Sequence, residues 1–137
     1  MKIHHIGIVV ADLDKALEAF CLTRDNLSET VRDEKQKNTL YFYFQKENDL
    51  WLEFIEPWDE KSTTASFAKR FGNSIHHIGF SSNDLNASEE KHQDSEGNFP
   101  LGRYDIDIYS FGGKGKTSFY ASKGMILEFV QPEPKEK

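Results

Sequence analysis

The sequence has little cysteine, an excess of acidic over basic residues and no long apolar run. Its one cysteine, Cys21, excludes a disulfide framework and a cysteine-rich zinc site. The 17 Lys and Arg against 23 Asp and Glu leave a net charge of −6, which argues against a nucleic-acid partner, because neutralising phosphates takes clustered Lys and Arg. The apolar stretch Ile6 to Ala11 is too short for a signal-peptide core or a membrane span. We therefore expect a cytoplasmic protein with no membrane partner.

What the 137-residue chain does contain is a repeat. The pentapeptide IHHIG at 3–7 recurs at 75–79, and WLEFIEP at 51–57 is echoed by ILEFVQP at 126–132. Two units of about 55 residues are each too small to bury a core alone, so they should fold together. We expect a single domain over 1–137 made of two repeats, with these boundaries: repeats at about 1–57 and 75–132, a connector at 58–74 and a mobile tail at 133–137.

Each repeat has the pattern of a strand, a helix and then two or three strands, which predicts an α+β fold. Asp12 is placed to cap a helix whose apolar face includes Leu13 and Leu17. The connector predicts a short helix from Ala65 to Phe71 that ends at Gly72. We also expect a helix within residues 84–96 of the second repeat, short or poorly packed because it has few apolar positions. We expect strands at 3–10, 39–45, 50–56 and 75–82, and near 104–110, 116–121 and 125–131.

The repeated His and Glu residues predict a metal site. Neighbouring side chains of a strand point to opposite faces, so only one histidine of each His-His pair can face a pocket. Glu53 and Glu128 lie on strands that are otherwise apolar, and a buried carboxylate needs a cation, a proton or a metal. One histidine and one glutamate from each repeat match the charge of one divalent cation. The mixed N/O donors suit Mn, Fe, Co, Ni or Zn.

On these residues the chain resembles the vicinal oxygen chelate superfamily, which includes glyoxalases, bleomycin-resistance proteins and extradiol dioxygenases. The resemblance implies two βαβββ modules that form a half-open curved-sheet barrel around a metal site. It selects the histidine before each Ile-Gly step, so the implied ligands are His5, Glu53, His77 and Glu128. The connector running into 75–78 is most similar to methylmalonyl-CoA epimerase-like and glyoxalase I-like members.

The resemblance implies a metal-dependent isomerase or lyase that moves a proton next to a metal-chelated carbonyl of a thioester or hemithioacetal. The corresponding reactions are those of methylmalonyl-CoA epimerase and lactoylglutathione lyase, with an acyl-CoA or a glutathione adduct as substrate. The resemblance also implies that the protein is a homodimer. Glu128 would act as both ligand and base. The epimerases use a second glutamate, whose position here falls near Gln36. Since glutamine cannot act as a base, this departure counts against an epimerase, and Glu34, two residues away, is the candidate second catalytic carboxylate.

Two other functions are compatible with the same fold. A small-molecule-binding or antibiotic-resistance protein is favoured by a possible aromatic wall, and an Fe(II) dioxygenase would not need Glu53 as a ligand. The wall would consist of Tyr41, Phe42, Tyr43, Phe44 and Trp51.

Overall fold

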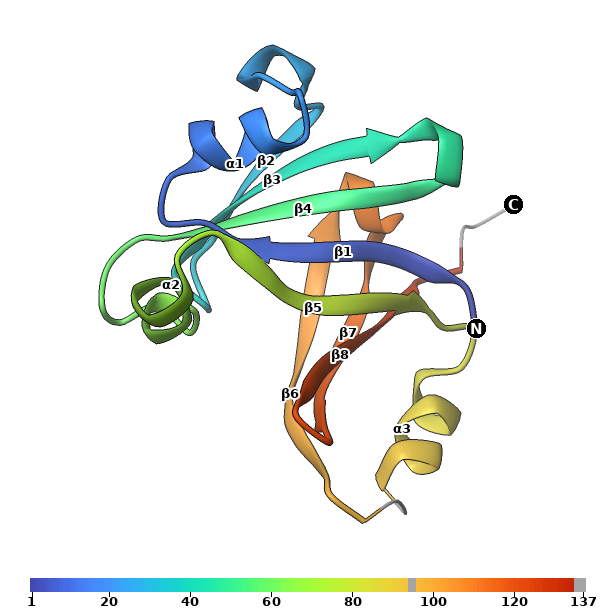
Figure 1. Cartoon of the computed structure of the whole chain (residues 1–137). Helices are drawn as coiled ribbons and strands as arrows, with labels where there is room; N and C mark the ends of the chain where they lie inside the picture. The colour runs from blue at the N-terminus through green and yellow to red at the C-terminus, as the bar shows by residue number, and fades with distance from the viewer. Residues whose placement is uncertain (94–95, 135–137) are drawn as a thin grey trace. The chain divides into compact units, whose positions relative to one another are not determined.

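The computed structural model describes residues 1–93 and 96–134 of the chain. Within them, eight strands and three α-helices follow one another as β1 (Ile3–Val9), α1 (Leu13–Ala19), β2 (Glu29–Asp33), β3 (Asn38–Gln45), β4 (Leu50–Pro57), α2 (Ala65–Phe71), β5 (Ser74–Ser81), α3 (Leu85–Gln93), β6 (Asn98–Ile108), β7 (Gly113–Ser122) and β8 (Met125–Pro132) (Figure 1). The α+β class and the βαβββ order of each repeat are confirmed. The last three residues of the predicted mobile tail lie outside the described residues.

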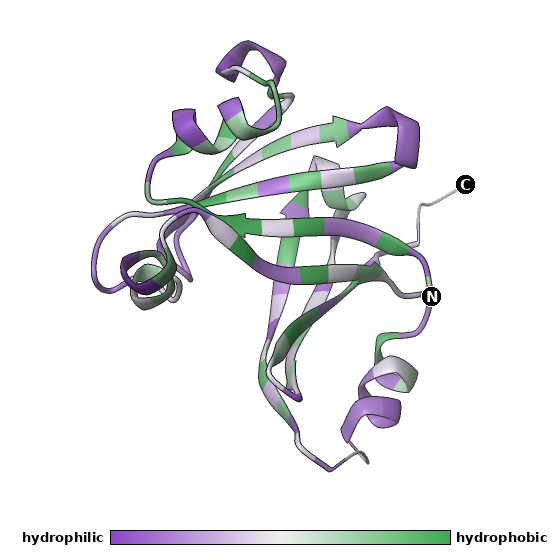
Figure 2. Cartoon of the chain, in the orientation of Figure 1, coloured by the Kyte–Doolittle hydropathy of each residue, from purple (hydrophilic) through white to green (hydrophobic). Residues whose placement is uncertain are grey.

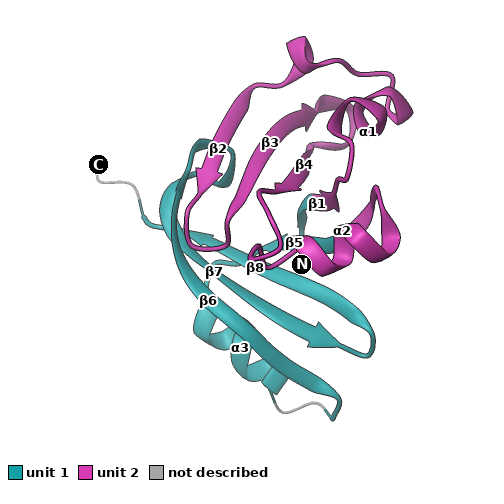
Figure 3. Cartoon of the chain, turned by 90° about the vertical axis from the view of Figure 1, so that its left-hand side faces the viewer, with its two compact units in different colours: residues 1–5, 77–137 teal, residues 6–76 magenta. Residues whose placement is uncertain are grey.

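The strands group into two compact units, and the division between them passes through β1 and β5 (Figure 3). Unit 2 comprises residues 6–76, and its strands are ordered β2-β3-β4-β1. Unit 1 comprises residues 1–5 and 77–137, with the order β1-β5-β8-β7-β6. Strands β5 and β8 pair in parallel, whereas β2-β3, β3-β4, β6-β7 and β7-β8 pair antiparallel. One domain made of two repeats, with the boundaries given above, stays a prediction.

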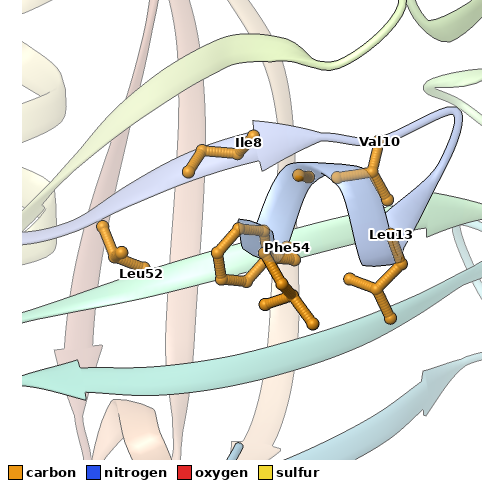
Figure 4. Packing of buried hydrophobic residues seen from close by; sticks show 7 residues of the cluster. Ile8, Val10, Leu13, Leu52 and Phe54 are labelled. Atoms are coloured by element: carbon orange, nitrogen blue, oxygen red, sulfur yellow. The ribbon is translucent and has the colours of Figure 1, made fainter. Parts of the chain in front are cut away.

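Helix α1 supplies much of the core of unit 2. It begins where predicted, because the side chain of Asp12 accepts a hydrogen bond of 3.1 Å from the backbone N–H of Lys15. The buried face of α1 packs against Ile8 of β1 and Val10 just after it, and against Leu52 and Phe54 of β4. Figure 2 shows hydrophobic and hydrophilic stretches following one another along both strands. Residues of β1 and β4 between these positions therefore point away from α1. The cluster consists of Ile8, Val10, Leu13, Ala16, Leu17, Leu52 and Phe54 (Figure 4).

We expect Phe54→Ala to lower the free energy of unfolding by about 3–5 kcal/mol, because Phe54 is fully buried and its removal leaves a cavity under α1. Urea denaturation followed by far-UV circular dichroism measures the change. Phe99→Ala is the control, because Phe99 is 63% exposed and its removal should change stability by less than about 0.5 kcal/mol. Equal losses in the two variants would contradict this packing.

Unit 1 has a smaller cluster under α3, formed by Leu85, Tyr120 and Phe129 with Phe80 packed against it. Leu85 is the buried residue of α3, in line with the few apolar positions expected there. Because side chains alternate, residues next to Phe80 and Phe129 point to the sheet face opposite α3. Glu128 is one of these residues.

Strand β6 differs from the prediction because it starts at Asn98 rather than near residue 104. Its pairing with β7 shifts register between Pro100 and Gly102, which marks a bulge. Proline cannot donate a hydrogen bond to a neighbouring strand, so a paired strand was not expected here, but the bulge accommodates Pro100. Connector helix α2 spans Ala65–Phe71 and is capped by Gly72, as predicted. None of the helices in the described ranges is long and apolar enough for a bilayer crossing.

Candidate metal centre

Three of the four predicted ligands come together on one face of unit 1. His5 lies on β1, His77 on β5 and Glu128 on β8, and their exposed fractions are 0%, 3% and 2%. The parallel pairing of β5 with β8 places Gly79 opposite Glu128, two residues along the strand from His77. Side chains of His77 and Glu128 therefore leave neighbouring strands on the same face.

The ligand atoms of these three residues form a nearly equilateral triangle. Nε2 of His5 lies 3.0 Å from Nε2 of His77 and 2.9 Å from Oε1 of Glu128. The remaining side, from Nε2 of His77 to Oε1 of Glu128, is 3.0 Å. Adjacent ligand atoms around a divalent ion with bonds of about 2.1 Å are about 3.0–3.4 Å apart. The three donors are therefore close enough together to bind one divalent ion.

Glu53 is a second buried carboxylate of the predicted set. It lies on β4 in unit 2, is 4% exposed and is paired in register with Phe42 of β3. It occupies the strand face that points away from α1, between Leu52 and Phe54 of the core cluster. His5, Glu53, His77 and Glu128 are all buried, and each offers a nitrogen or a carboxylate oxygen of the kind that binds metal ions.

The surroundings of Glu128 keep it ionised. Burial alone would raise the pKa of this carboxyl, but the charges and hydrogen bonds of His5 and His77 hold that pKa well below its usual range. The hydroxyl of Thr117 on β7, itself buried, donates a hydrogen bond to Oε2 of Glu128. Both carboxylate oxygens are therefore oriented, with Oε1 towards the histidines and Oε2 towards Thr117.

This lowered pKa predicts how the metal-free protein responds to acid. A carboxyl whose pKa is depressed in the folded state contributes stability above the usual glutamate pKa of about 4.3, and this stability is lost as the pH falls below that value. We expect the free energy of unfolding of the wild type to fall more steeply below about pH 4.3 than that of Glu128→Gln. Urea denaturation between pH 6 and pH 2.5 makes the comparison, and parallel pH curves would contradict the ionised state of Glu128.

A residue that the sequence did not single out lies directly behind His5. Nδ1 of His4 is 2.9 Å from Nδ1 of His5, and Nε2 of His4 is 3.1 Å from the backbone oxygen of Ser110. Burial and the neighbouring His5 lower the pKa of His4 to about 4. The ring of Phe111 stacks on His5 with centroids 4.8 Å apart. Sequence reasoning gave His4 no role of its own, and its contact with Ser110 joins segments that no local pattern connects.

Glu34 and the predicted aromatic wall belong to unit 2. The side chain of Glu34 is 74% exposed and pairs loosely with Arg32, at 3.8 Å; its catalytic role stays a prediction. The aromatic residues do not form one wall, so that expectation is corrected. Tyr41 and Tyr43 pack against the cluster under α1. Phe42 and Phe44 each contact Trp51 on the other face, because side chains alternate along β3.

Comparisons with known proteins agree with this architecture. Residues 4–109 match the sequence profile of the Glyoxalase/Bleomycin resistance protein/Dioxygenase superfamily, and the chain belongs to this superfamily. No curated protein matches the sequence.

Solved structures of other proteins share the fold, among them the following three. Methylmalonyl-CoA epimerase from Mycobacterium tuberculosis is 24% identical, with a TM-score of 0.76 over 97% of this chain and 89% of that one. A variant of the Streptomyces coelicolor methylmalonyl-CoA epimerase in complex with 2-nitronate-propionyl-CoA is 25% identical, with a TM-score of 0.75 over 98% and 99%. A hypothetical protein from Bacillus halodurans is 19% identical, with a TM-score of 0.77 over 99% and 97%.

Proposed function

We propose that this chain is a metal-dependent isomerase or lyase that transfers a proton next to a carbonyl of a thioester or hemithioacetal. The observation that carries the proposal is the triangle of buried donor atoms of His5, His77 and Glu128, with sides of 2.9–3.0 Å. Glu53 is proposed as the fourth ligand, since it is the buried carboxylate of the first repeat that corresponds to Glu128 of the second. The ion would be one of Mn, Fe, Co, Ni or Zn, which suit mixed nitrogen and oxygen donors.

The residues of the site have separate roles in the proposed proton transfer. A divalent ion bound by them would supply a Lewis acid that stabilises negative charge developing on a substrate oxygen. Glu128 takes the proton from the neighbouring carbon and returns it, because its carboxylate lies at the donor triangle where the substrate oxygen would be held. Thr117 holds Oε2 of that carboxylate in place. His5 and His77 bind the ion through Nε2.

The proposed substrates are acyl-CoA thioesters or glutathione adducts, in keeping with the epimerases that share the fold. A homodimer and a cytoplasmic location belong to the same proposal. Light scattering coupled to size-exclusion chromatography tests the dimer, for which we expect twice the chain mass of 15.8 kDa.

Metal content tests the site itself. We expect purified protein, after chelation and reloading with Mn, Co, Ni or Zn, to retain one ion per chain through desalting. His77→Ala should retain less than about a tenth as much, because it removes a donor of the triangle. His92→Ala is the matched control, since His92 contacts Tyr120 and Phe129 on the α3 side. A wild type that retains no ion under any loading condition would contradict the proposal.

The second carboxylate is tested separately. If Glu34 carries a proton in the reaction, Glu34→Gln should lower turnover by about 10²-fold or more without changing the metal content. If turnover of Glu34→Gln equals that of the wild type, Glu34 has no catalytic role.

A further inference from the structure

The sheet face of unit 1 that carries the donor triangle also carries a half-buried phenylalanine and a half-buried tyrosine. Residues directly opposite one another in antiparallel strands point to the same face, so the pairing of Phe119 with Glu128 places both on the face of the triangle. Gly102 of β6 is paired with Phe119 in turn. Tyr104 lies two residues further along β6, and it therefore points to this face as well.

The ring of Tyr104 lies over Gly102, in the row of paired residues that includes Glu128. A Cβ atom at Gly102 would lie 2.8 Å from the phenol oxygen and 3.0 Å from Cζ of Tyr104, so the ring fills the space that a side chain would need. Tyr104 and Phe119 are in edge-on contact with ring centroids 6.0 Å apart, and Phe119 and His77 are in edge-on contact at 5.5 Å. Aromatic contacts thus connect the donor triangle with a phenol hydroxyl.

The position of this hydroxyl suits the unreactive half of a thioester substrate. Neighbouring strands are about 4.8 Å apart, so the backbones of Gly102 and Glu128, two strands apart, are separated by about 10 Å. A substrate whose carbonyl oxygen is held at the triangle would lie with several bonds over Phe119 before it reaches the hydroxyl. Acyl-CoA thioesters and glutathione adducts both carry an amide group within that span, on the sulfur side of the carbonyl.

A neutral acceptor fits this face better than an anion does. Among the described residues of unit 1, the strands place no Lys or Arg on the face of the triangle. Arg103 and Lys116 lie on the α3 side of the sheet, where they form ion pairs with Glu89 and Asp105. An amide oxygen needs no cation, whereas a carboxylate here would lack one. A tyrosine hydroxyl can donate to such an oxygen, and within the described part of the chain that of Tyr104 makes no other hydrogen bond.

We propose that Tyr104 recognises the thiol arm of the substrate, its hydroxyl donating a hydrogen bond to an amide carbonyl oxygen. The pantetheine arm of coenzyme A and the peptide of glutathione share this group. The inference rests on the proposed function and adds to it a residue that determines specificity for the half of the substrate that does not react. A single neutral hydrogen bond contributes modestly, so loss of the hydroxyl should weaken binding by about 3- to 10-fold and leave the metal content unchanged.

One substitution removes this hydroxyl and keeps the ring. Tyr104→Phe retains the contact with Phe119. Tyr120→Phe is the matched control, because it removes a phenol hydroxyl on the α3 side of the neighbouring strand β7, where the oxygen of Tyr120 accepts a hydrogen bond of 3.4 Å from Nε2 of Gln93. The probes are the acetonyl thioethers of coenzyme A, glutathione and ethanethiol. Each carries a ketone for the triangle, and the ethanethiol arm has no amide.

Isothermal titration calorimetry measures binding of the coenzyme A and glutathione probes, and NMR titration measures that of the ethanethiol probe. We expect the wild type to bind at least one amide-bearing probe about 3- to 10-fold more tightly than Tyr104→Phe does, and Tyr120→Phe to match the wild type within about twofold. The ethanethiol probe should bind equally to the wild type and to Tyr104→Phe.

Three outcomes would overturn the proposal: unchanged affinity of Tyr104→Phe for the amide-bearing probes, an equal loss with the ethanethiol probe, or a wild type that binds neither amide-bearing probe. The titration needs no turnover, so its result is separate from that of the proposed function. A wild type that binds a probe as expected but exchanges no proton on any substrate would overturn the proposed function instead.

Discussion

Glu128→Gln should abolish most of the proton exchange while leaving the fold intact. The substitution keeps the shape of the side chain and an oxygen for His5, His77 or a metal, but an amide cannot accept a proton from carbon. General bases contribute about 10²- to 10⁴-fold to such reactions, so we expect solvent-deuterium exchange at saturating metal to fall by at least about 10²-fold. Mass spectrometry of the recovered substrate measures the exchange.

The matched control is Glu53→Gln, which changes the equivalent carboxylate of the first repeat. Because Glu53 is proposed as a ligand only, its substitution should weaken metal binding and lower exchange at saturating metal by less than about tenfold. If the two variants lose exchange equally when fully loaded with metal, the division of roles between Glu53 and Glu128 is wrong.

Gly79→Ala should disrupt the centre by a steric route, although it changes no ligand. A Cβ atom at Gly79 would lie 2.0 Å from Cε1, 2.3 Å from Nδ1 and 2.5 Å from Nε2 of His5, so the ring must move. Displacing a ring that is buried against Phe111 costs stability, and overpacking of this kind costs about 1–3 kcal/mol. Since Nε2 of His5 leaves the triangle as well, we also expect metal affinity to fall by about 10- to 100-fold.

A double-mutant cycle shows whether the clash with His5 is the cause. In a His5→Ala background the ring is gone, so adding Gly79→Ala should cost less than about 0.5 kcal/mol in urea denaturation. A cost that stays the same with and without the His5 ring would mean that Gly79 is required for another reason.

Local patterns were sufficient to predict most of the elements. The cap at Asp12 and the apolar face of α1 depend on residues within two helical turns, and α2 ends at a glycine with φ of +67°. Two strands were harder to predict from the sequence. The bounds of β6 depend on a bulge at Pro100 that only its pairing with β7 makes possible, and β2, at the edge of its sheet, is a half-buried strand with a mostly polar sequence.

The site was predictable where the repeat duplicated its chemistry and not where it depended on distant contacts. The duplicated IHHIG and the two strand glutamates led to the four proposed ligands, whose role in binding metal stays a prediction. Residues that contact these ligands have no such signature. Thr117 reaches Glu128 across a strand pair, and His4 reaches a backbone oxygen 106 residues away. Such contacts follow from register and packing, which no single segment encodes.

The most direct test of the central claim is deuterium incorporation at the α-carbon of methylmalonyl-CoA and of a glutathione hemithioacetal in D₂O. The wild-type protein should catalyse exchange with at least one of these probes, lose it on chelation, and regain it when one equivalent of Mn, Co, Ni or Zn is restored. Exchange that persists unchanged in chelated protein would contradict a reaction that depends on a metal ion bound by the proposed ligands.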